Sequence, residues 1–585
     1  MVRFLGTLNF LAALCCLTAL VPLGGAGGST VANRLSEDPS VSVLLLEAGG
    51  ANDDDLDMYI PLLCTRLTPN TPFDWNYTTV PQTGLNNRSV SYPTGFGLGG
   101  STSVNCLVYT RGSIADIDLW GQLTDDPTWS WDNLLPYYKK SERFNFPRDG
   151  HNVSGEFLPQ VHGFDGVIGV SLPGSPRAID GMVISTLEEL PAEFPYNVDM
   201  NSGANLGVGW VQALVDGGVR SSAKQYLAKE YVSRENLDVL LHAKVSRVLP
   251  TNSDNEALAF RAVEFLEPGS GSLGNLTAAV EVILSAGSIN TPNILLHSGI
   301  GDADLLESVG VPLAHNLTDV GKGLRDHVGV ATVFLVNSTE TFDTVIRNET
   351  LLDEWIAQWN ESKTGLLVDT SENHVAWLRV PDNSTFYEEF PDPASSNKSA
   401  HMEILFQVTK NGLSSVTVEG NYMNVLTACV APTSRGSISI NSSDLFAPPL
   451  VDPGLLSTES DLFIVRESIR SLRRFLAAPA WDDYIITSTN DNATTDEEIN
   501  EFIKENAVSF YHPVASAAMS PYNATHGVVN PDLRVKGVDG LRIIDASVAP
   551  SLPGAHTSAT VYVIAERAAD IIKAEYGYYG YYGLE

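Results

Sequence analysis

The sequence predicts an α/β protein with two lobes, one built on a parallel sheet and the other on an antiparallel sheet with helices. The chain has 585 residues, which is enough for more than one domain. Near the N-terminus, a glycine-rich turn, a helix pattern and a buried strand pattern follow one another, whereas residues 311–500 contain short β-like runs and no such turn. With 43% hydrophobic and 18% charged residues, the composition is that of a globular protein.

The balance of charge argues against polyanionic partners. The chain carries 35 basic and 70 acidic side chains, and its formal net charge is −35. Such a charge repels phosphate backbones and anionic lipids. We therefore expect neither nucleic acid nor a membrane as a partner, and no spacing of side chains predicts a metal site.

Residues 1–26 resemble a secretory signal. Residues 4–23 carry no charge and follow Arg3, and no later segment is long and apolar enough to span a membrane. Thirteen N-x-S/T sequons support export, so we expect a secreted, extracellular glycoprotein. Two of the five cysteines lie in this segment, which leaves Cys64, Cys106 and Cys429 and at most one disulfide among them.

The first glycine block, residues 24–28, opens a Rossmann-like unit. A helix pattern follows it, and a buried strand pattern over residues 41–46 then ends in Glu47. Gly25 and Gly28 match two glycines of a dinucleotide-binding turn. Glu47 lies 19 residues beyond Gly28, close to the spacing at which a carboxylate reaches ribose hydroxyls.

The strand before this block is irregular. Leu23 stands where the first glycine of the turn belongs, and the strand over residues 17–23 would contain Pro22, which cannot donate to a central ladder. Either the chain has lost its true first strand, for example through a misassembled gene model, or the apolar segment is retained and packs imperfectly. We favour the first alternative.

Two further glycine blocks follow. In residues 95–105, consecutive glycines and hydroxyls at Gly99, Gly100 and Ser101 allow the backbone to approach a large planar or phosphorylated ligand. Residues 287–301 follow a strand pattern, place Pro292 in the first turns of a helix, and end that helix at Ser298-Gly299.

The C-terminal region contains two histidines in unusual positions. His512 precedes a proline, and His556 lies at the start of a helix whose N-terminal end would stabilise an anion. A strand over residues 541–544 ends in Asp545. Together these features predict a site for acid–base chemistry.

These blocks together resemble the glucose-methanol-choline (GMC) family of FAD oxidoreductases, most closely its fungal aryl-alcohol oxidases and pyranose dehydrogenases. Residues 95–112 are similar to the first family signature, except at Phe96, and residues 287–301 are similar to the second. The resemblance implies FAD extended across the first lobe. The cofactor-binding residues that it implies are Gly25, Gly28, Glu47, Gly99, Gly100, Ser101, Asn105, Val245, Asp545, Ala546 and Thr557.

The resemblance also implies the organisation of the chain. A FAD-binding lobe over residues 27–310, with interspersed segments of the second lobe, is followed by a substrate-binding lobe over residues 311–500. The chain returns to the first lobe over residues 501–575 and ends in a Tyr/Gly tail, residues 576–585. Similar pyranose dehydrogenases often tether FAD through a histidine where this chain has Val104, so we expect non-covalent FAD.

The implied chemistry is alcohol oxidation. His512 would take the hydroxyl proton, His556 would hydrogen-bond the developing alkoxide, and amides near Thr557 would stabilise charge on the reduced flavin. Phe510 and Tyr511 would wall the substrate site. We expect a primary aryl alcohol as substrate and oxygen or a quinone as acceptor.

Three alternatives stay open at this point. The chain could be a pyranose dehydrogenase, a FAD hydroxynitrile lyase without net redox chemistry, or a flavin-free inactive homologue.

Overall fold

A five-stranded parallel sheet forms the centre of the first lobe in the computed structural model, which describes residues 19–22, 24–252, 257–410 and 419–577. Its strand order is β10-β2-β1-β14-β26. Every residue of β2 and β14 is buried, as expected for a parallel sheet covered on both faces. The strands are β1 (Ala19–Pro22), β2 (Val43–Leu46), β10 (Leu237–Leu240), β14 (Glu281–Leu284) and β26 (Leu541–Ile543).

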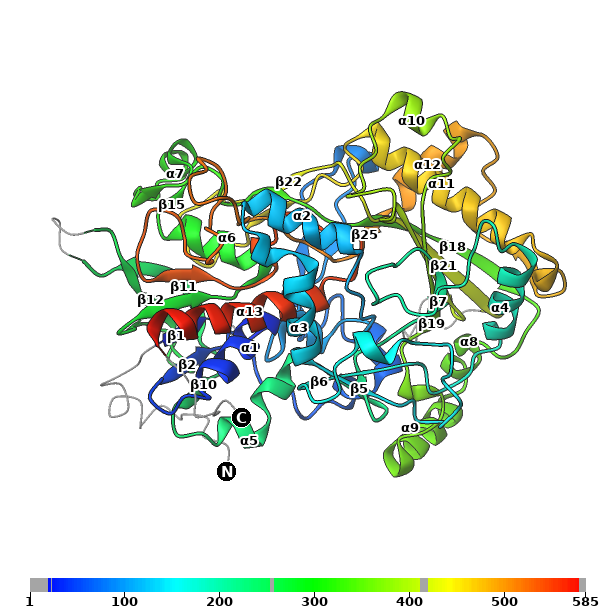
Figure 1. Ribbon diagram of the computed structural model, residues 1–585, viewed down its shortest axis with the longest axis horizontal. Helices are drawn as coiled ribbons and strands as arrows, with labels where there is room; N and C mark the ends of the chain where they lie inside the picture. The colour runs from blue at the N-terminus through cyan, green and yellow to red at the C-terminus, as the bar shows by residue number, and fades with distance from the viewer. Residues whose placement is uncertain (1–18, 23, 253–256, 411–418, 578–585) are drawn as a thin grey trace.

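Helices α1 (Ala26–Leu35) and α13 (Ser558–Tyr576) pack against each other beside this sheet, and α3 (Trp131–Ser141) packs on α13 (Figure 1). An antiparallel sheet of β11 (Lys244–Pro250), β12 (Phe260–Leu266) and β13 (Leu273–Thr277) contacts β14 through β12 and packs on α6 (Gly287–His297) through β11. Helix α6 ends where the sequence predicts, with Gly299 at φ +77°. The parallel sheet and its helices confirm the predicted α/β lobe.

The first strand is formed by residues that the sequence analysis assigned to the signal-like segment. Ala19–Pro22 pairs with β2 along its whole length, so the expectation that the first strand has been lost is wrong for the structure. On the other side, pairing with β14 ends at Leu20, and Pro22 therefore needs no donor toward that strand. Residues 1–18, the larger part of the signal-like segment, lie outside the described residues.

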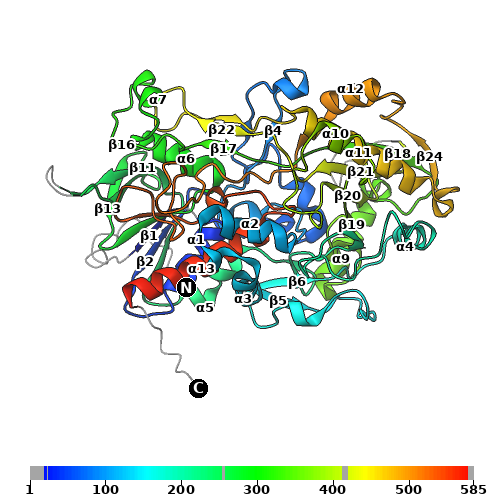
Figure 2. The same cartoon turned by 45° about the horizontal axis from the view of Figure 1, so that its top comes forward.

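The second lobe is built on a larger antiparallel sheet, with strand order β24-β18-β21-β20-β19-β7 and β25 paired to β18. In the turned view of Figure 2, this sheet and its helices lie at the opposite end of the molecule from β1 and β2. Helix α11 (Glu459–Leu476) packs on β20 and β21, and α12 (Asp496–Asn506) packs on β18. The strands are β7 (Gly207–Trp210), β18 (Val328–Val336), β19 (Glu372–Leu378), β20 (Met402–Gln407), β21 (Tyr422–Cys429), β24 (Ile485–Ser488) and β25 (Val508–Ser509).

Two of these strands, β7 and β25, come from outside residues 311–500, so the lobes interleave in sequence. The described residues contain no helix that is both long and apolar enough to cross a bilayer. The remaining helices are α2 (Ile114–Thr124), α4 (Asp180–Glu189), α5 (Lys229–Val232), α7 (Ala303–Ser308), α8 (Phe342–Ile346), α9 (Glu349–Ser362) and α10 (Phe386–Glu389). The remaining strands are β3 (Tyr77–Thr78), β4 (Ser91–Tyr92), β5 (Glu142–Asn145), β6 (Ile168–Ser171), β8 (Val215–Asp216), β9 (Val219–Arg220), β15 (Ile300–Gly301), β16 (His315–Asn316), β17 (Lys322–Leu324), β22 (Gly436–Ser439) and β23 (Leu450–Asp452).

Candidate active site

A cavity of about 510 Å³ lies between the two sheets. The first lobe contributes the turns after β1, β14 and β26, and the second lobe contributes side chains of β19, β20 and β21. Along β20, Leu405 and Gln407 face this central cavity, whereas Ile404 and Phe406 belong to the apolar cluster that includes residues of α11. The alternation along the strand thus separates the cavity wall from the core.

Three helix N-termini converge on the central cavity. Helix α1 begins after Gly25, α6 after Ala286, and α13 after Thr557, and these three residues line the cavity. None of the three helices is capped by the side chain of its N-cap residue. Their dipoles therefore favour negative charge: at α6 the Asp545 carboxylate supplies it, and α1 and α13 favour it in a bound group such as a pyrophosphate.

Two glycine blocks touch through their backbones beside α1. The Gly99 amide donates to the Gly24 carbonyl at 2.7 Å, and a Cβ placed on Gly100 would lie 3.0 Å from the Cα of Gly25. Glu47, at the end of β2, accepts from the Gly24 amide through Oε2 and from the Gly49 amide through Oε1, both at 2.8 Å. Burial raises the pKa of Glu47 while these amides hold its charged form. The result is a cradle of backbone with no room for side chains.

Asp545 holds the start of α6 against the end of β26. It accepts from the Gly287 amide at 2.9 Å, the Thr291 hydroxyl at 2.6 Å and the Ser547 amide at 2.8 Å. Burial raises the pKa of this carboxyl. Asp545 therefore fixes one of the three helix N-termini that face the cavity.

The two predicted histidines lie side by side in the cavity wall, with ring centroids 4.6 Å apart. Nδ1 of His512 lies 3.0 Å from Nδ1 of His327, and Nε2 of His556 lies 2.7 Å from Oε1 of Glu403. Burial, followed by the neighbouring His556, lowers the pKa of His512 well below 6.5. His512 is therefore neutral at neutral pH and can accept a proton.

Most of the residues predicted as site residues line the central cavity. Those brought together are Gly25, Glu47, Gly100, Ser101, Asn105, Phe510, Tyr511, His512, Asp545, Ala546, His556 and Thr557. Three predicted residues do not line it. Gly28 is buried inside α1, and the amide of Gly99 is hydrogen-bonded to the Gly24 carbonyl. Val245 belongs to β11, and its side chain packs in the hydrophobic core.

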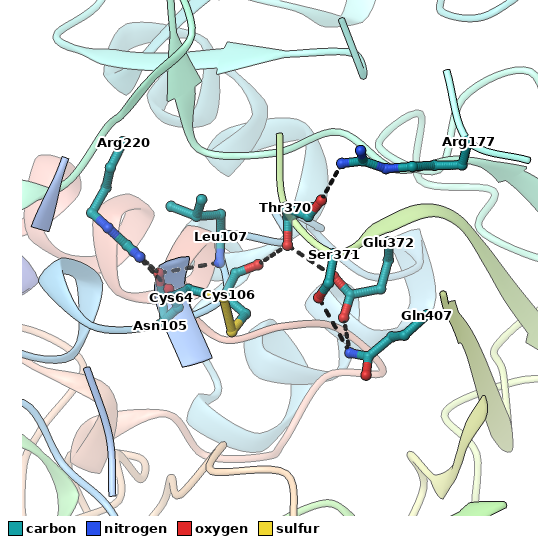
Figure 3. Close-up of a disulfide and its surroundings, with 10 residues drawn as sticks. All are labelled: Cys64, Asn105, Cys106, Leu107, Arg177, Arg220, Thr370, Ser371, Glu372 and Gln407. Carbon is teal, nitrogen blue, oxygen red and sulfur yellow. Dashed lines mark hydrogen bonds between the residues drawn. A yellow bond between two sulfur atoms is a disulfide. The ribbon is translucent and has the colours of Figure 1, made fainter. Parts of the chain in front are cut away.

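The sequence analysis missed the polar wall of the second lobe (Figure 3). Gln407 Nε2 donates to Glu372 Oε1, and Thr370 Oγ1 lies 2.8 Å from Glu372 Oε2 and 2.7 Å from the Cys106 carbonyl oxygen. Cys64 and Cys106 form a disulfide at the cavity wall, which settles the pairing that the cysteine count left open. Period-two alternation predicts which strand residues share a face, but it does not show which cavity that face meets.

The residues present fit a dinucleotide. The glycine cradle and the helix N-termini offer amides to phosphates, and buried hydroxyls of Ser285 and Ser558 in the cavity wall have no partner among the described residues. Unpaired buried donors beside an open cavity are what an absent polar ligand would leave. FAD is a ligand of this kind.

Comparison with known proteins gives the class. Family models described as GMC oxidoreductase match residues 17–329 and 432–565. The chain belongs to the GMC oxidoreductase family of flavoproteins, which confirms the resemblance drawn from its motifs.

Individual relatives cover nearly the whole chain. Dehydrogenase eriK of Hericium erinaceus is 39% identical over 94% of this chain and 93% of its own, and a pyranose dehydrogenase of Agaricus campestris is 38% identical over 95% and 93%. Among solved structures, a fungal aryl-alcohol oxidase is 27% identical with a TM-score of 0.83, covering 96% of this chain and 99% of its own. A formate oxidase is 26% identical with a TM-score of 0.87, covering 96% of this chain and 99% of its own.

Proposed function

We propose that this oxidoreductase removes a hydride and a proton from an alcohol, and that a primary aryl alcohol is the first candidate substrate. The observation that carries the proposal is the pair of adjacent imidazoles, His512 and His556, in a cavity faced by three helix N-termini. When bound, FAD supplies the hydride acceptor at its N5 atom.

Side chains and amides of the cavity wall accept the proton, stabilise charge and exclude water. Neutral His512 takes the hydroxyl proton, and His556, oriented by Glu403, hydrogen-bonds the substrate oxygen as charge develops there. Amides at the start of α13 stabilise negative charge beside Thr557. Leu405, Leu426 and Phe510 supply apolar wall that excludes water.

We propose that FAD is held without a covalent tether. Val104 carries no nucleophile, is 6% exposed and packs in an apolar cluster with Met58 and Leu67. Cys64 and Cys106 are bonded to each other. Acid precipitation should therefore release the flavin into the supernatant, and flavin that stays with the pellet would contradict this proposal.

Sugar oxidation is the second candidate. Buried Glu372 and half-buried Gln407 give the second-lobe wall acceptors and donors suited to several hydroxyl groups. The pyranose dehydrogenase relatives, at 35–38% identity, support the same candidate. For either substrate we propose oxygen or a quinone as the electron acceptor.

Anaerobic flavin reduction tests the proposal directly. Purified protein should absorb near 450 nm and lose that absorbance when a substrate is added. A panel of benzylic alcohols and monosaccharides would separate the two candidates by their rates. Colourless protein that does not bind added FAD would indicate a flavin-free homologue. Cleavage of a cyanohydrin without loss of the flavin absorbance would indicate a lyase.

We also propose that the protein is exported and N-glycosylated. All thirteen sequon asparagines are exposed, against five of the other 21 asparagines in the described ranges, so the sequons coincide with the surface that a glycan requires. The disulfide is of the kind that persists in oxidising compartments. Mass spectrometry before and after enzymatic deglycosylation, including the N-terminal peptide, tests both points; unmodified sequons in protein from the native host would contradict them.

A further inference from the structure

His512 is held at two points by a neighbouring Asp-His dipeptide, residues 326 and 327. Oδ1 of Asp326 accepts from the backbone amide of His512 at 2.8 Å, and Oδ2 accepts from the hydroxyls of Tyr92 and Ser509, each at 2.5 Å. His327 contacts the ring of His512 through Nδ1 at 3.0 Å. The dipeptide therefore sets both the backbone and the ring of the proposed base.

Strand pairing brings these distant residues together. His327 immediately precedes β18, and β25 pairs with β18 so that the Phe510 amide donates to the His327 carbonyl at 2.9 Å. Tyr511 then adopts a positive φ of +62°, which turns the chain at His512. Its amide bonds to Ser509 Oγ at 2.7 Å and holds this uncommon conformation.

The contact between two Nδ1 atoms constrains the protons on both rings. Two neutral imidazoles can share this bond only if one Nδ1 carries a proton and the other offers a lone pair. If His512 donates, its Nε2 keeps a lone pair for the substrate proton. If His327 donates, Nε2 of neutral His512 carries the proton and cannot act as a base.

The surroundings of His327 decide between these two arrangements. The ring is fully buried, and the backbone carbonyls of Val430 and Pro553 face it. Because Nδ1 faces His512, we assign these carbonyls to Nε2, which forms no hydrogen bond within normal limits to the described residues. Two carbonyl oxygens beside Nε2 favour a proton there, so Nδ1 of His327 keeps the lone pair.

We propose that His327 is a positioning residue that accepts the Nδ1 proton of His512 and so keeps Nε2 of His512 available as the proton acceptor. The proposal rests on the proposed role of His512 as base. When the substrate proton arrives at Nε2, His512 becomes an imidazolium whose Nδ1–H is already paired with a neutral acceptor. His327 itself stays neutral, because burial and then the neighbouring His556 lower its pKa to about 3.

Other titratable groups surround His512 as well. His556, with Glu403 behind it, stands 4.6 Å from the His512 ring, and Asp326 bonds to its amide, with Tyr92 and Tyr511 nearby. Burial raises the pKa of Asp326 to about 6. The variants below leave all of these groups in place, so a change can be assigned to the contact between the two rings.

The direct test is the tautomer of His512 in the flavin-containing protein. Long-range ¹H–¹⁵N spectra of protein labelled with ¹⁵N-histidine report which ring nitrogen carries the proton, and the spectrum of His512→Asn assigns the signals. We expect the proton on Nδ1. A proton on Nε2 in the wild-type protein overturns the proposal, whether or not any alcohol reduces the flavin.

Matched variants test the functional consequence. His327→Asn keeps an acceptor oxygen near the position of Nδ1, whereas His327→Leu has similar bulk and no acceptor. With bound flavin unchanged, we expect His327→Leu to slow reduction roughly 10- to 100-fold, by analogy with groups that orient metal-binding histidines, and His327→Asn to restore most of the rate. Equal rates in His327→Leu and wild type overturn the proposal.

The pH profile separates positioning from mere loosening of the site. Without an acceptor the imidazolium form of His512 is less stable, so the acid limb of the rate profile should move to lower pH in His327→Leu. Water entry into a loosened site would move that limb upward, toward the ordinary value for histidine, and that result would overturn the proposal. If no alcohol in the panel reduces the flavin, the proposed function fails while the tautomer measurement still decides the role of His327.

Discussion

The surroundings of His512 set the pKa of its imidazole. Burial and then the neighbouring His556 disfavour its charged form, so its pKa lies well below 6.5 and the ring is neutral through the physiological range. A base of this kind works at any pH above its own pKa. We therefore expect the rate of flavin reduction to stay level from neutral into mildly acidic pH and to fall only as the pH drops through that lowered pKa.

Substitution His512→Ala should leave flavin binding intact and remove the base. The loss expected for one general base is about two to four orders of magnitude in the rate of flavin reduction. Stopped-flow measurement of anaerobic reduction checks this, with the absorbance near 450 nm as the control for bound cofactor. Near-normal reduction would exclude the role of His512.

Glu403 orients the second imidazole through a charge-assisted hydrogen bond, at 2.7 Å, from inside the protein. Glu403→Gln keeps an acceptor oxygen and nearly the same volume but removes the charge. The difference between charged and neutral hydrogen bonds is about 1 kcal/mol, which corresponds to roughly fivefold in rate. A variant that reduces as fast as wild type would show that His556 is held by packing alone.

At the scale of elements, the sequence predicted the glycine turns, the helix starts and the strand ends that form the cofactor side of the cavity. Gly25, Asp545 and Thr557 were found because each stands at a junction where turn chemistry is local. His327, Glu403 and Glu372 were not found, because they reach the site through strand pairing over long sequence separations. The parallel sheet was predicted without its first strand, since Pro22 at the strand end was read as an obstacle inside it.

Helix α1 lies so close to the end of β26 that only glycine fits at residue 27. A Cβ at Gly27 would lie 2.0 Å from the carbonyl oxygen of Ile544, a backbone atom that cannot rotate away. Gly27→Ala should therefore displace α1 and its N-terminus, lowering both the thermal midpoint and the flavin content. Thermal unfolding and absorbance near 450 nm measure the two effects.

Gly181, in α4, provides the matched control for this substitution. It is exposed, and a Cβ there would meet no atom within 4 Å. Gly181→Ala should stabilise the protein by about 0.5–1 kcal/mol because alanine is the better helix former. If Gly27→Ala behaved like Gly181→Ala, close packing of α1 would not be what requires glycine.

At the scale of the whole molecule, a buried ionic network links residues that are far apart in the sequence. Arg111 bonds to Glu142 at the start of β5, and His162 lies 2.9 Å from both Glu142 Oε1 and Asp199 Oδ2, in the segment that leads to β7. Hydrogen bonds to the two carboxylates outweigh burial and raise the pKa of His162 above 6.5. The hydrogen bond between His162 and Asp199 also outweighs burial at Asp199 and lowers the pKa of that carboxyl below 3.8. The stability that His162 contributes is complete below pH 6.5 and is lost as the pH rises through its raised pKa. The stability that Asp199 contributes is complete above pH 3.8 and is lost as the pH falls through its lowered pKa.

The pH dependence of unfolding should therefore change when the buried histidine is replaced. We expect His162→Gln to cost about 3 kcal/mol near pH 6, where the imidazolium pairs with both carboxylates, and less near pH 9, where wild type has lost this contribution. His151 offers a surface control, because it bonds in the same way to Asp149 and Glu156 but its side chain is 34% exposed, where water and salt screen the interaction. Thermal midpoints of wild type, His162→Gln and His151→Gln across this range compare the two sites. Because an exposed pair contributes little, His151→Gln should follow wild type; equal pH dependence in the two variants would mean that packing, and not charge, holds the buried network together.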